Sequence, residues 1–218
     1  MYEVILFDLD GTLTDPGEGI TNSVAHALER LGRPVPPRQA LYRFIGPPLC
    51  ESFMDFCGLD RPGGLRAVEL YREYYREKGI WENQVYAGIP ELLAQLRSAG
   101  RKLLVATSKP EEFAHQILEH FHLSPYFDFV SGASMDSRRV RKADVIARAL
   151  AHEGLPPGPA LVMVGDREHD VLGAREAGLD CVGVLFGYGS RAELEAAGAA
   201  KIAATVPELA RILLEGMS

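Results

Sequence analysis

Hydrophobic residues divide the chain into two regions with different spacing. Between residues 16 and 85, apolar side chains recur every three or four positions, which is typical of amphipathic helices. Glycine and proline separate these helical patterns and mark where each helix ends. The region therefore predicts helices at 20–31, 39–45, 49–56 and 65–78.

The rest of the chain alternates short aliphatic runs with helical patterns. Aliphatic runs bounded by turn residues predict buried strands, here at 4–7, 103–106, 127–130, 161–164 and 181–185. Helices are predicted at 89–96, 111–121, 142–153, 171–177 and 206–214. Aliphatic strands that alternate with helices are typical of a parallel sheet covered on both faces.

The fold class that follows is α/β, a doubly wound parallel sheet with an inserted all-helical domain. Residues 1–15 and 86–218 are expected to form the sheet domain, and residues 16–85 the insertion. Sheets of this kind bind ligands beyond the carboxyl ends of their strands. The insertion leaves the sheet at that edge, directly after the first strand, and is therefore a candidate lid.

Composition narrows the setting of these domains. With 47% hydrophobic residues, the 218-residue chain can form a packed core, and its formal net charge of −7 argues against nucleic acid or an anionic membrane as the main partner. Its three cysteines form no CxxC pair, which disfavours a disulfide framework or a zinc site. No apolar run approaches the roughly 18 residues of a membrane span, and the first strand begins too early for a signal peptide. A soluble, cytoplasmic protein is expected.

Two carboxylates, Asp8 and Asp10, directly follow the first strand. Because side chains in a strand alternate between its faces, both carboxylates project to the same side. Gly11 then allows the backbone to turn sharply beside them. Neighbouring carboxylates repel each other unless one is protonated or a cation screens both. The pair predicts either a metal site or a nucleophile with a general acid.

Polar residues also follow two other strands. Thr107, Ser108 and Lys109 follow the strand at 103–106, and acidic residues follow the strand at 161–164. Lys142 opens the helix before that later strand. Because parallel strands share one carboxyl edge, we expect carboxylates, hydroxyls and an ammonium group to converge there.

With these residues in view, the chain resembles the haloacid dehalogenase superfamily, in particular its helical-capped phosphatases of the phosphoglycolate phosphatase type. Four motifs carry the resemblance, in order and on strand ends: Asp8-x-Asp10-Gly11-Thr12, Thr107, Lys142 and Gly165-Asp166-x-x-x-Asp170. The likeness covers nearly the whole chain and implies a Rossmann-like core with a helical cap. One departure is Ala143, where the family often has proline after the lysine.

The resemblance implies a mechanism through a covalent intermediate. Asp8 would attack phosphorus and form an aspartyl-phosphate. Asp10 would protonate the leaving oxygen and then deprotonate the water that hydrolyses the intermediate. Mg²⁺ would be held by Asp8, the backbone carbonyl of Asp10 and Asp166, because this hard cation prefers oxygen ligands.

Other matched residues would bind the phosphoryl group or support the ligands. Thr107 and nearby backbone N–H groups would bind the phosphoryl oxygens, and Lys142 would counter their charge. Asp170 and Thr12 would lie behind these groups, with Asp170 orienting Lys142 or a water molecule.

Three residues are weaker candidates for contacts with the substrate. Ser108 and Lys109 follow the phosphate-binding threonine, although a solvated side chain is the favoured interpretation of Lys109. Gly46 belongs to a Gly-Pro-Pro loop of the insertion, which either contacts substrate or only separates two helices.

The predicted function is a Mg²⁺-dependent phosphatase for a small phosphorylated metabolite, acting as a monomer or homodimer. A phosphomutase of the same superfamily would keep both acids. Two alternatives come from another class: a phosphoaspartate signalling receiver, which has no place for the insertion, and a non-catalytic phosphate-binding protein, which has little use for both acids. Phosphoglycolate, a nucleoside monophosphate, pyrophosphate and a sugar phosphate all stay open as substrates.

Overall fold

The computed structural model describes residues 2–135 and 139–215, and in it the chain divides into two compact units. One unit comprises Met1–Thr14 with Val85–Ser218, and the other comprises Asp15–Gln84. The sequence predicts each boundary one residue later, after residues 15 and 85.

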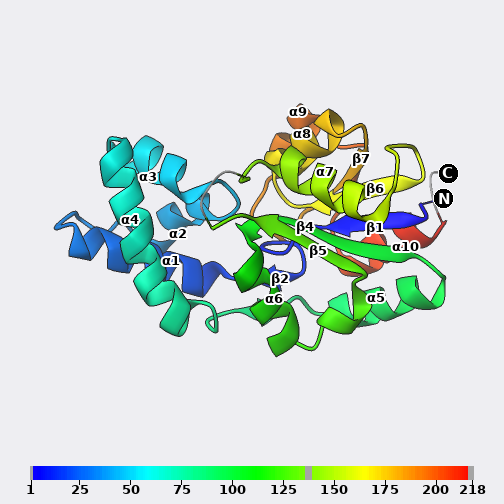
Figure 1. Cartoon of the computed structure of the whole chain (residues 1–218), viewed down its shortest axis with the longest axis horizontal. Helices are drawn as coiled ribbons and strands as arrows, with labels where there is room; N and C mark the ends of the chain where they lie inside the picture. Colours follow the sequence, from blue (N-terminus) through cyan, green and yellow to red (C-terminus); the bar gives the residue numbers. More distant parts are fainter. Residues whose placement is uncertain (1, 136–138, 216–218) are drawn as a thin grey trace. The chain divides into compact units, whose positions relative to one another are not determined.

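The larger unit contains a six-stranded sheet whose neighbouring strands are all parallel (Figure 1). The strands in spatial order are β5 (Phe129–Ala133), β4 (Lys102–Pro110), β1 (Val4–Phe7), β6 (Leu161–Gly165), β7 (Asp180–Val184) and β8 (Lys201–Ala203). The aliphatic strands β1 and β6 are buried along their whole length, as a sheet covered on both faces requires. The predicted α/β fold class is confirmed.

Helices cover both faces of this sheet (Figure 1). One face carries α7 (Lys142–Glu153), α8 (Glu168–Glu176) and α9 (Arg191–Ala197), and the other carries α5 (Ile89–Ser98), α6 (Glu111–His120) and α10 (Val206–Glu215). Leu6 and Met163 of the sheet share a buried cluster with Val145, Ala149 and Val171. This packing holds the first turns of α7 and α8 beside the strand ends.

The smaller unit is helical, drawn in blue to cyan in Figure 1. It contains α1 (Gly17–Arg30), α2 (Arg38–Leu41), the 3₁₀ turn η1 (Tyr42–Phe44), α3 (Leu49–Cys57), α4 (Arg61–Tyr74) and the π-helical turn η2 (Tyr75–Gly79). Short strands β2 (Thr14–Asp15) and β3 (Gln84–Val85) pair where the chain enters and leaves this unit. Helices α1 and η2 approach closely, since a Cβ on Gly19 would lie 1.9 Å from the carbonyl oxygen of Gly79.

Several elements differ from those predicted. The sequence does not predict α9 and β8, because seven and three residues are too short to show a clear period. Helix α4 begins four residues earlier than predicted because the Asp60 side chain accepts a hydrogen bond from the Gly63 N–H and caps it. The helix predicted at 39–45 is split into α2 and η1, α8 begins three residues early, and β5 begins two residues late. No helix among the described residues is long and apolar enough to cross a membrane.

Candidate active site

Four buried aspartates gather at the carboxyl ends of β1 and β6. Because these two strands are paired in parallel, the residues that follow them emerge side by side. Asp8 and Asp10 follow β1, Asp166 follows β6, and Asp170 lies in the first turn of α8. One carboxylate oxygen from each of Asp8, Asp166 and Asp170 lies within 4.8 Å of the other two. The acids that the sequence predicts at this edge are therefore neighbours.

The turn after β1 makes this gathering possible. Gly11 has a φ of +83°, which residues with a side chain rarely adopt. A Cβ at this position would also lie 2.3 Å from Oδ2 of Asp166. Glycine is therefore required both by the turn and by the close approach of Asp166. In the same turn, the buried hydroxyl of Thr12 has no hydrogen-bond partner among the described residues, and its supporting role stays a prediction.

Lys142 begins α7, and its side chain contacts two of the four aspartates. Its buried Nζ lies 2.7 Å from Oδ1 of Asp170 and 2.8 Å from Oδ1 of Asp8, and it donates to the Ala106 carbonyl at 3.1 Å. Burial would lower the pKa of Lys142, but Asp170 and Asp8 raise it above its usual value, so the side chain is a cation. Gly173 of α8 leaves room for it, since a Cβ there would lie 2.7 Å from Cβ and Cγ of Lys142.

Lys109 is also buried, and the solvated side chain favoured from the sequence is wrong. Its Nζ donates to Oδ2 of Asp10 at 2.5 Å. Burial raises the pKa of Asp10, and the ammonium of Lys109 opposes that shift. No local pattern could predict this pair, because the two residues are 99 positions apart and meet only when β1 pairs with β4. A contact between Lys109 and substrate stays a prediction.

The other predicted substrate contacts lie in two places. Thr107 is buried in an irregular part of β4, where the register with β5 shifts between Ala106 and Pro110. Its hydroxyl oxygen accepts a hydrogen bond from the Lys109 N–H at 3.2 Å, and the neighbouring Ser108 is half-buried. Gly46 lies in the helical unit between η1 and α3, and its role in substrate binding stays a prediction.

We call the four aspartates and two lysines described above the aspartate site, and this site has a net negative charge. Its members are Asp8, Asp10, Asp166, Asp170, Lys109 and Lys142. Four carboxylates contribute −4 and two lysines contribute +2, so the set carries a formal charge of −2. Burial raises the pKa of Asp166 well above its usual range, and the charge of Asp170 adds to this. Burial also raises the pKa of Asp170, although Lys142 opposes the shift. Among the described residues, Oδ1 of Asp166 has no hydrogen-bond partner. Buried carboxylate oxygens with this net negative charge fit a divalent cation such as Mg²⁺.

One further contact to the aspartate site comes from a residue to which the sequence assigns no role. The backbone N–H of Tyr188 donates to Oδ2 of Asp166 at 2.7 Å. A backbone N–H cannot be inferred from residue type, because every residue except proline has one. The sequence feature that could have indicated this close approach is the pair of flanking glycines, Gly187 and Gly189.

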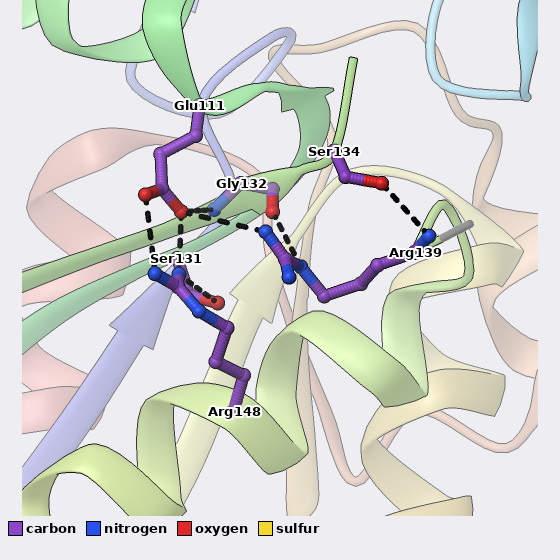
Figure 2. Close-up of polar contacts among 6 residues, drawn as sticks. All are labelled: Glu111, Ser131, Gly132, Ser134, Arg139 and Arg148. Atoms are coloured by element: carbon purple, nitrogen blue, oxygen red, sulfur yellow. Dashed lines mark hydrogen bonds and ion pairs between the residues drawn. The ribbon is translucent and has the colours of Figure 1, made fainter. Parts of the chain in front are cut away.

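A second charged cluster, which we call the Glu111 cluster, lies at the end of β5 (Figure 2). Glu111 pairs with Arg148, whose Nη2 donates to Oε1 at 3.1 Å, and the Gly132 N–H donates to Oε2 at 3.0 Å. Arg139 donates from Nε to the Gly132 carbonyl at 3.0 Å, and Arg148 donates to Oγ of Ser131 at 3.3 Å. The cluster ties β5 to α6 and α7, and sequence reasoning does not identify it.

Comparison with known proteins agrees with this architecture. Residues 5–184 match the family model described as haloacid dehalogenase-like hydrolase. A 5′-nucleotidase of Pseudomonas aeruginosa is 49% identical over 195 residues, which cover 89% of this chain and 88% of that protein. Tyrosine-protein kinase PtkA of Mycobacterium tuberculosis is 44% identical over 97% of this chain and 72% of its own length. A phosphoglycolate phosphatase of Pseudomonas savastanoi is 30% identical over 85% of this chain and 70% of its own.

A solved structure gives the same result in three dimensions. The crystal structure of a predicted phosphatase from Clostridium acetobutylicum superposes with a TM-score of 0.96 at 45% identity, and the match covers 99% of both chains. The family model spans β1 to β7 and includes all four aspartates of the site. The chain therefore belongs to the haloacid dehalogenase-like hydrolase family.

Proposed function

We propose that this chain is a Mg²⁺-dependent phosphatase that hydrolyses small phosphate monoesters. The observation that carries the proposal is the setting of Asp8, a buried carboxylate that Lys142 contacts at 2.8 Å and that lies beside Asp10 and Asp166. A carboxylate held in this way is suited to nucleophilic attack. Relatives named 5′-nucleotidase and phosphoglycolate phosphatase support the cleavage of a phosphate ester.

Two aspartates divide the chemistry between them. The Asp8 carboxylate attacks phosphorus, and the bond from phosphorus to the leaving oxygen breaks, which leaves an aspartyl-phosphate. Asp10 gives its proton to that oxygen and then takes a proton from the water that hydrolyses the aspartyl-phosphate. The raised pKa of Asp10 supports this role, because a protonated acid is needed in the first step. Asp8 is regenerated when phosphate leaves.

Positive charge is needed beside these acids because nucleophile and substrate are both anions. Asp8, the backbone carbonyl of Asp10 and Asp166 would hold Mg²⁺, which supplies charge that reduces this repulsion. Asp170 also lies within reach of that position, but its 2.7 Å pair with Lys142 supports a role in holding the lysine. Thr107 and Lys142 would bind the phosphoryl oxygens.

The substrate is best sought among nucleoside 5′-monophosphates first. The relative with 49% identity is named a 5′-nucleotidase, whereas the relative named phosphoglycolate phosphatase is 30% identical. The helical unit Asp15–Gln84 is the candidate for selecting the leaving group, and its Gly46 loop is the first segment to vary. Values of kcat/KM for nucleotides, phosphoglycolate, pyrophosphate and sugar phosphates would rank these classes.

Phosphate release from p-nitrophenyl phosphate tests the reaction itself. We expect turnover with Mg²⁺, no turnover after chelation, and no turnover in Asp8→Asn. Steady turnover by folded Asp8→Asn protein, or no turnover of any monoester by the wild-type protein with Mg²⁺, would refute the phosphatase.

A second candidate is transfer of the phosphoryl group to a hydroxyl other than that of water. The similarity to a relative named tyrosine-protein kinase, 44% identical over 97% of this chain, favours including it. The same Asp8 would carry the phosphoryl group, and the acceptor would decide the product. Label from γ-labelled ATP appearing on a tyrosine peptide, and absent with Asp8→Asn, would support transfer; label found only in free phosphate would exclude it for that donor.

A further inference from the structure

A glycine-rich turn after β7 lies against Asp166. A Cβ on Gly187 would lie 2.2 Å from the carbonyl oxygen of Gly11 and 2.5 Å from both Cβ and Oδ2 of Asp166. A Cβ on Gly189 would lie 1.8 Å from the carbonyl oxygen of Asp166. Real Cβ atoms do not occur at such distances, so the backbone of this turn approaches Asp166 as only glycine permits.

This close approach brings a backbone donor of the turn to Asp166. Between the two glycines, the Tyr188 N–H donates to Oδ2 of Asp166 at 2.7 Å, a short distance for a backbone donor and a carboxylate. Oδ1 of the same carboxylate is buried and has no hydrogen-bond partner among the described residues. The two oxygens of Asp166 are therefore not equivalent, because the turn engages one and leaves the other for a different partner.

We propose that the turn Gly187–Tyr188–Gly189 is a positioning element for the divalent cation, holding Asp166 by Oδ2 so that Oδ1 is its ligand oxygen. This inference rests on the metal site of the proposed function. The role assigned to the turn is exerted through Asp166, the carboxylate to which the Tyr188 N–H donates. Groups that hydrogen-bond a metal ligand in this way commonly change metal affinity about 10- to 100-fold when they are lost.

The test separates this role from simple packing. Gly187→Ala inserts a methyl group between the turn and Asp166, and replacement of Tyr188 by its α-hydroxy acid analogue exchanges only the N–H for an ester oxygen. Two controls match them. Gly158→Ala adds a methyl group at a glycine with no atom within 4 Å of the added Cβ, and Tyr188→Phe alters the side chain but keeps the N–H.

The main readout is Mn²⁺ binding, which is monitored through the electron paramagnetic resonance signal of the free ion. It needs no substrate. Melting curves in chelator report the fold separately. We expect Mn²⁺ affinity to fall about 10-fold or more in both test variants, and to stay at the wild-type value in both controls. Because the ester variant adds no atom, it keeps the test decisive where Gly187→Ala fails to fold.

Three results would count against the turn. Wild-type Mn²⁺ affinity in the folded ester variant would overturn the positioning role of the turn. A lower melting temperature in chelator with unchanged Mn²⁺ affinity would do the same. A wild-type protein that binds no Mn²⁺ would overturn the metal site and the turn together. Mn²⁺ binding without phosphatase turnover would instead refute the proposed function and leave the turn supported by the variants.

Discussion

The aspartate site and the Glu111 cluster lie at strand ends of the same sheet, yet they treat carboxylates in opposite ways. Glu111 has one carboxylate facing two arginines and a backbone N–H, and both of its oxygens accept hydrogen bonds (Figure 2). The aspartate site has four carboxylates facing two lysines, and Oδ1 of Asp10 and of Asp166 has no partner among the described residues. Protein groups therefore bind both carboxylate oxygens of Glu111, whereas the aspartate site keeps carboxylate oxygens without a hydrogen-bond partner among the described residues.

This difference indicates which cluster is built for chemistry. A buried polar group without a partner costs about 1–3 kcal/mol, and more when it is charged. A fold retains several such groups where a ligand later offsets the cost, and perturbed acids therefore concentrate at functional sites. Both carboxylate oxygens of Glu111 have hydrogen-bond partners, so the expected contribution of the Glu111 cluster is to hold β5, α6 and α7 together.

The largest expected contrast comes from exchanging a carboxylate for an amide in each cluster. Asp8→Asn should lower kcat for p-nitrophenyl phosphate on the order of 10⁴-fold or more, because an amide cannot act as the nucleophile. Glu111→Gln makes the same atomic exchange away from the reacting groups and should leave kcat unchanged. Steady-state phosphate release and a melting curve for each variant measure this. A folded Glu111→Gln protein without activity would show that the clusters are not separate in function.

Metal binding should also separate the two clusters. Mg²⁺ at about 100 times its Kd should stabilise the wild-type protein by about 2.7 kcal/mol, because the ion binds the folded state. Asp166→Asn should lose this gain, since it removes a carboxylate that we propose as a ligand and one negative charge from the aspartate site. Glu111→Gln should retain it. Thermal unfolding with Mg²⁺ and with chelator gives the comparison, and equal stabilisation of both variants would contradict the assignment of Asp166.

Lys109 sharpens the comparison within the aspartate site, because it engages only one oxygen of Asp10. Lys109→Met should remove the contact that orients the Asp10 carboxyl group and lower kcat/KM for an alkyl phosphate by roughly 10- to 100-fold, since the leaving oxygen needs a proton from a correctly placed acid. Hydrolysis of p-nitrophenyl phosphate should change far less, because nitrophenolate leaves without one.

Lys102→Met is a matched control for Lys109→Met, because Lys102 lies on the same strand and pairs with Glu153 away from the site. It should affect neither substrate. An equal loss on both substrates in Lys109→Met would indicate that Lys109 serves the phosphate or the fold instead of the leaving group.

The fold and the acids were predictable because their signals are local. Aliphatic runs bounded by turn residues locate the central strands, and strand alternation with a following glycine places Asp8 and Asp10 at one edge. The parallel sheet then brings Asp166 to the same edge. Each step needs only residues close in sequence and the rule that parallel strands share their carboxyl ends.

The long-range contacts within each cluster were not predictable, because no local pattern encodes them. Lys109 and Asp10 are 99 residues apart, and Arg148 and Glu111 are 37 apart. A lone lysine or arginine is usually exposed, so its type favours solvent until packing is known. The Tyr188 donor is a backbone group, which any residue but proline would supply. The sequence therefore indicates the reaction better than the contacts that tune it.

The smallest expected effect concerns the strength of the Glu111 cluster itself. Breaking a fully buried ion pair costs about 3–5 kcal/mol, whereas exposed pairs contribute about 1 kcal/mol or less. The side chains of Glu111 and Arg148 are 29% and 33% exposed, so solvent screens them in part. We expect a coupling energy of about 1–2 kcal/mol between them.

A double-mutant cycle of Glu111→Gln and Arg148→Met, measured by urea unfolding, isolates that coupling. The cycle is needed because Arg148 also lies over the Phe129 ring at 5.0 Å, and Arg148→Met loses this contact as well. All three variants should keep the kcat of the wild-type protein while losing stability. A coupling energy near zero would mean that shape, and not charge, holds β5 to α6 and α7. The contrast would then lie between a site that depends on its charges and a scaffold that does not.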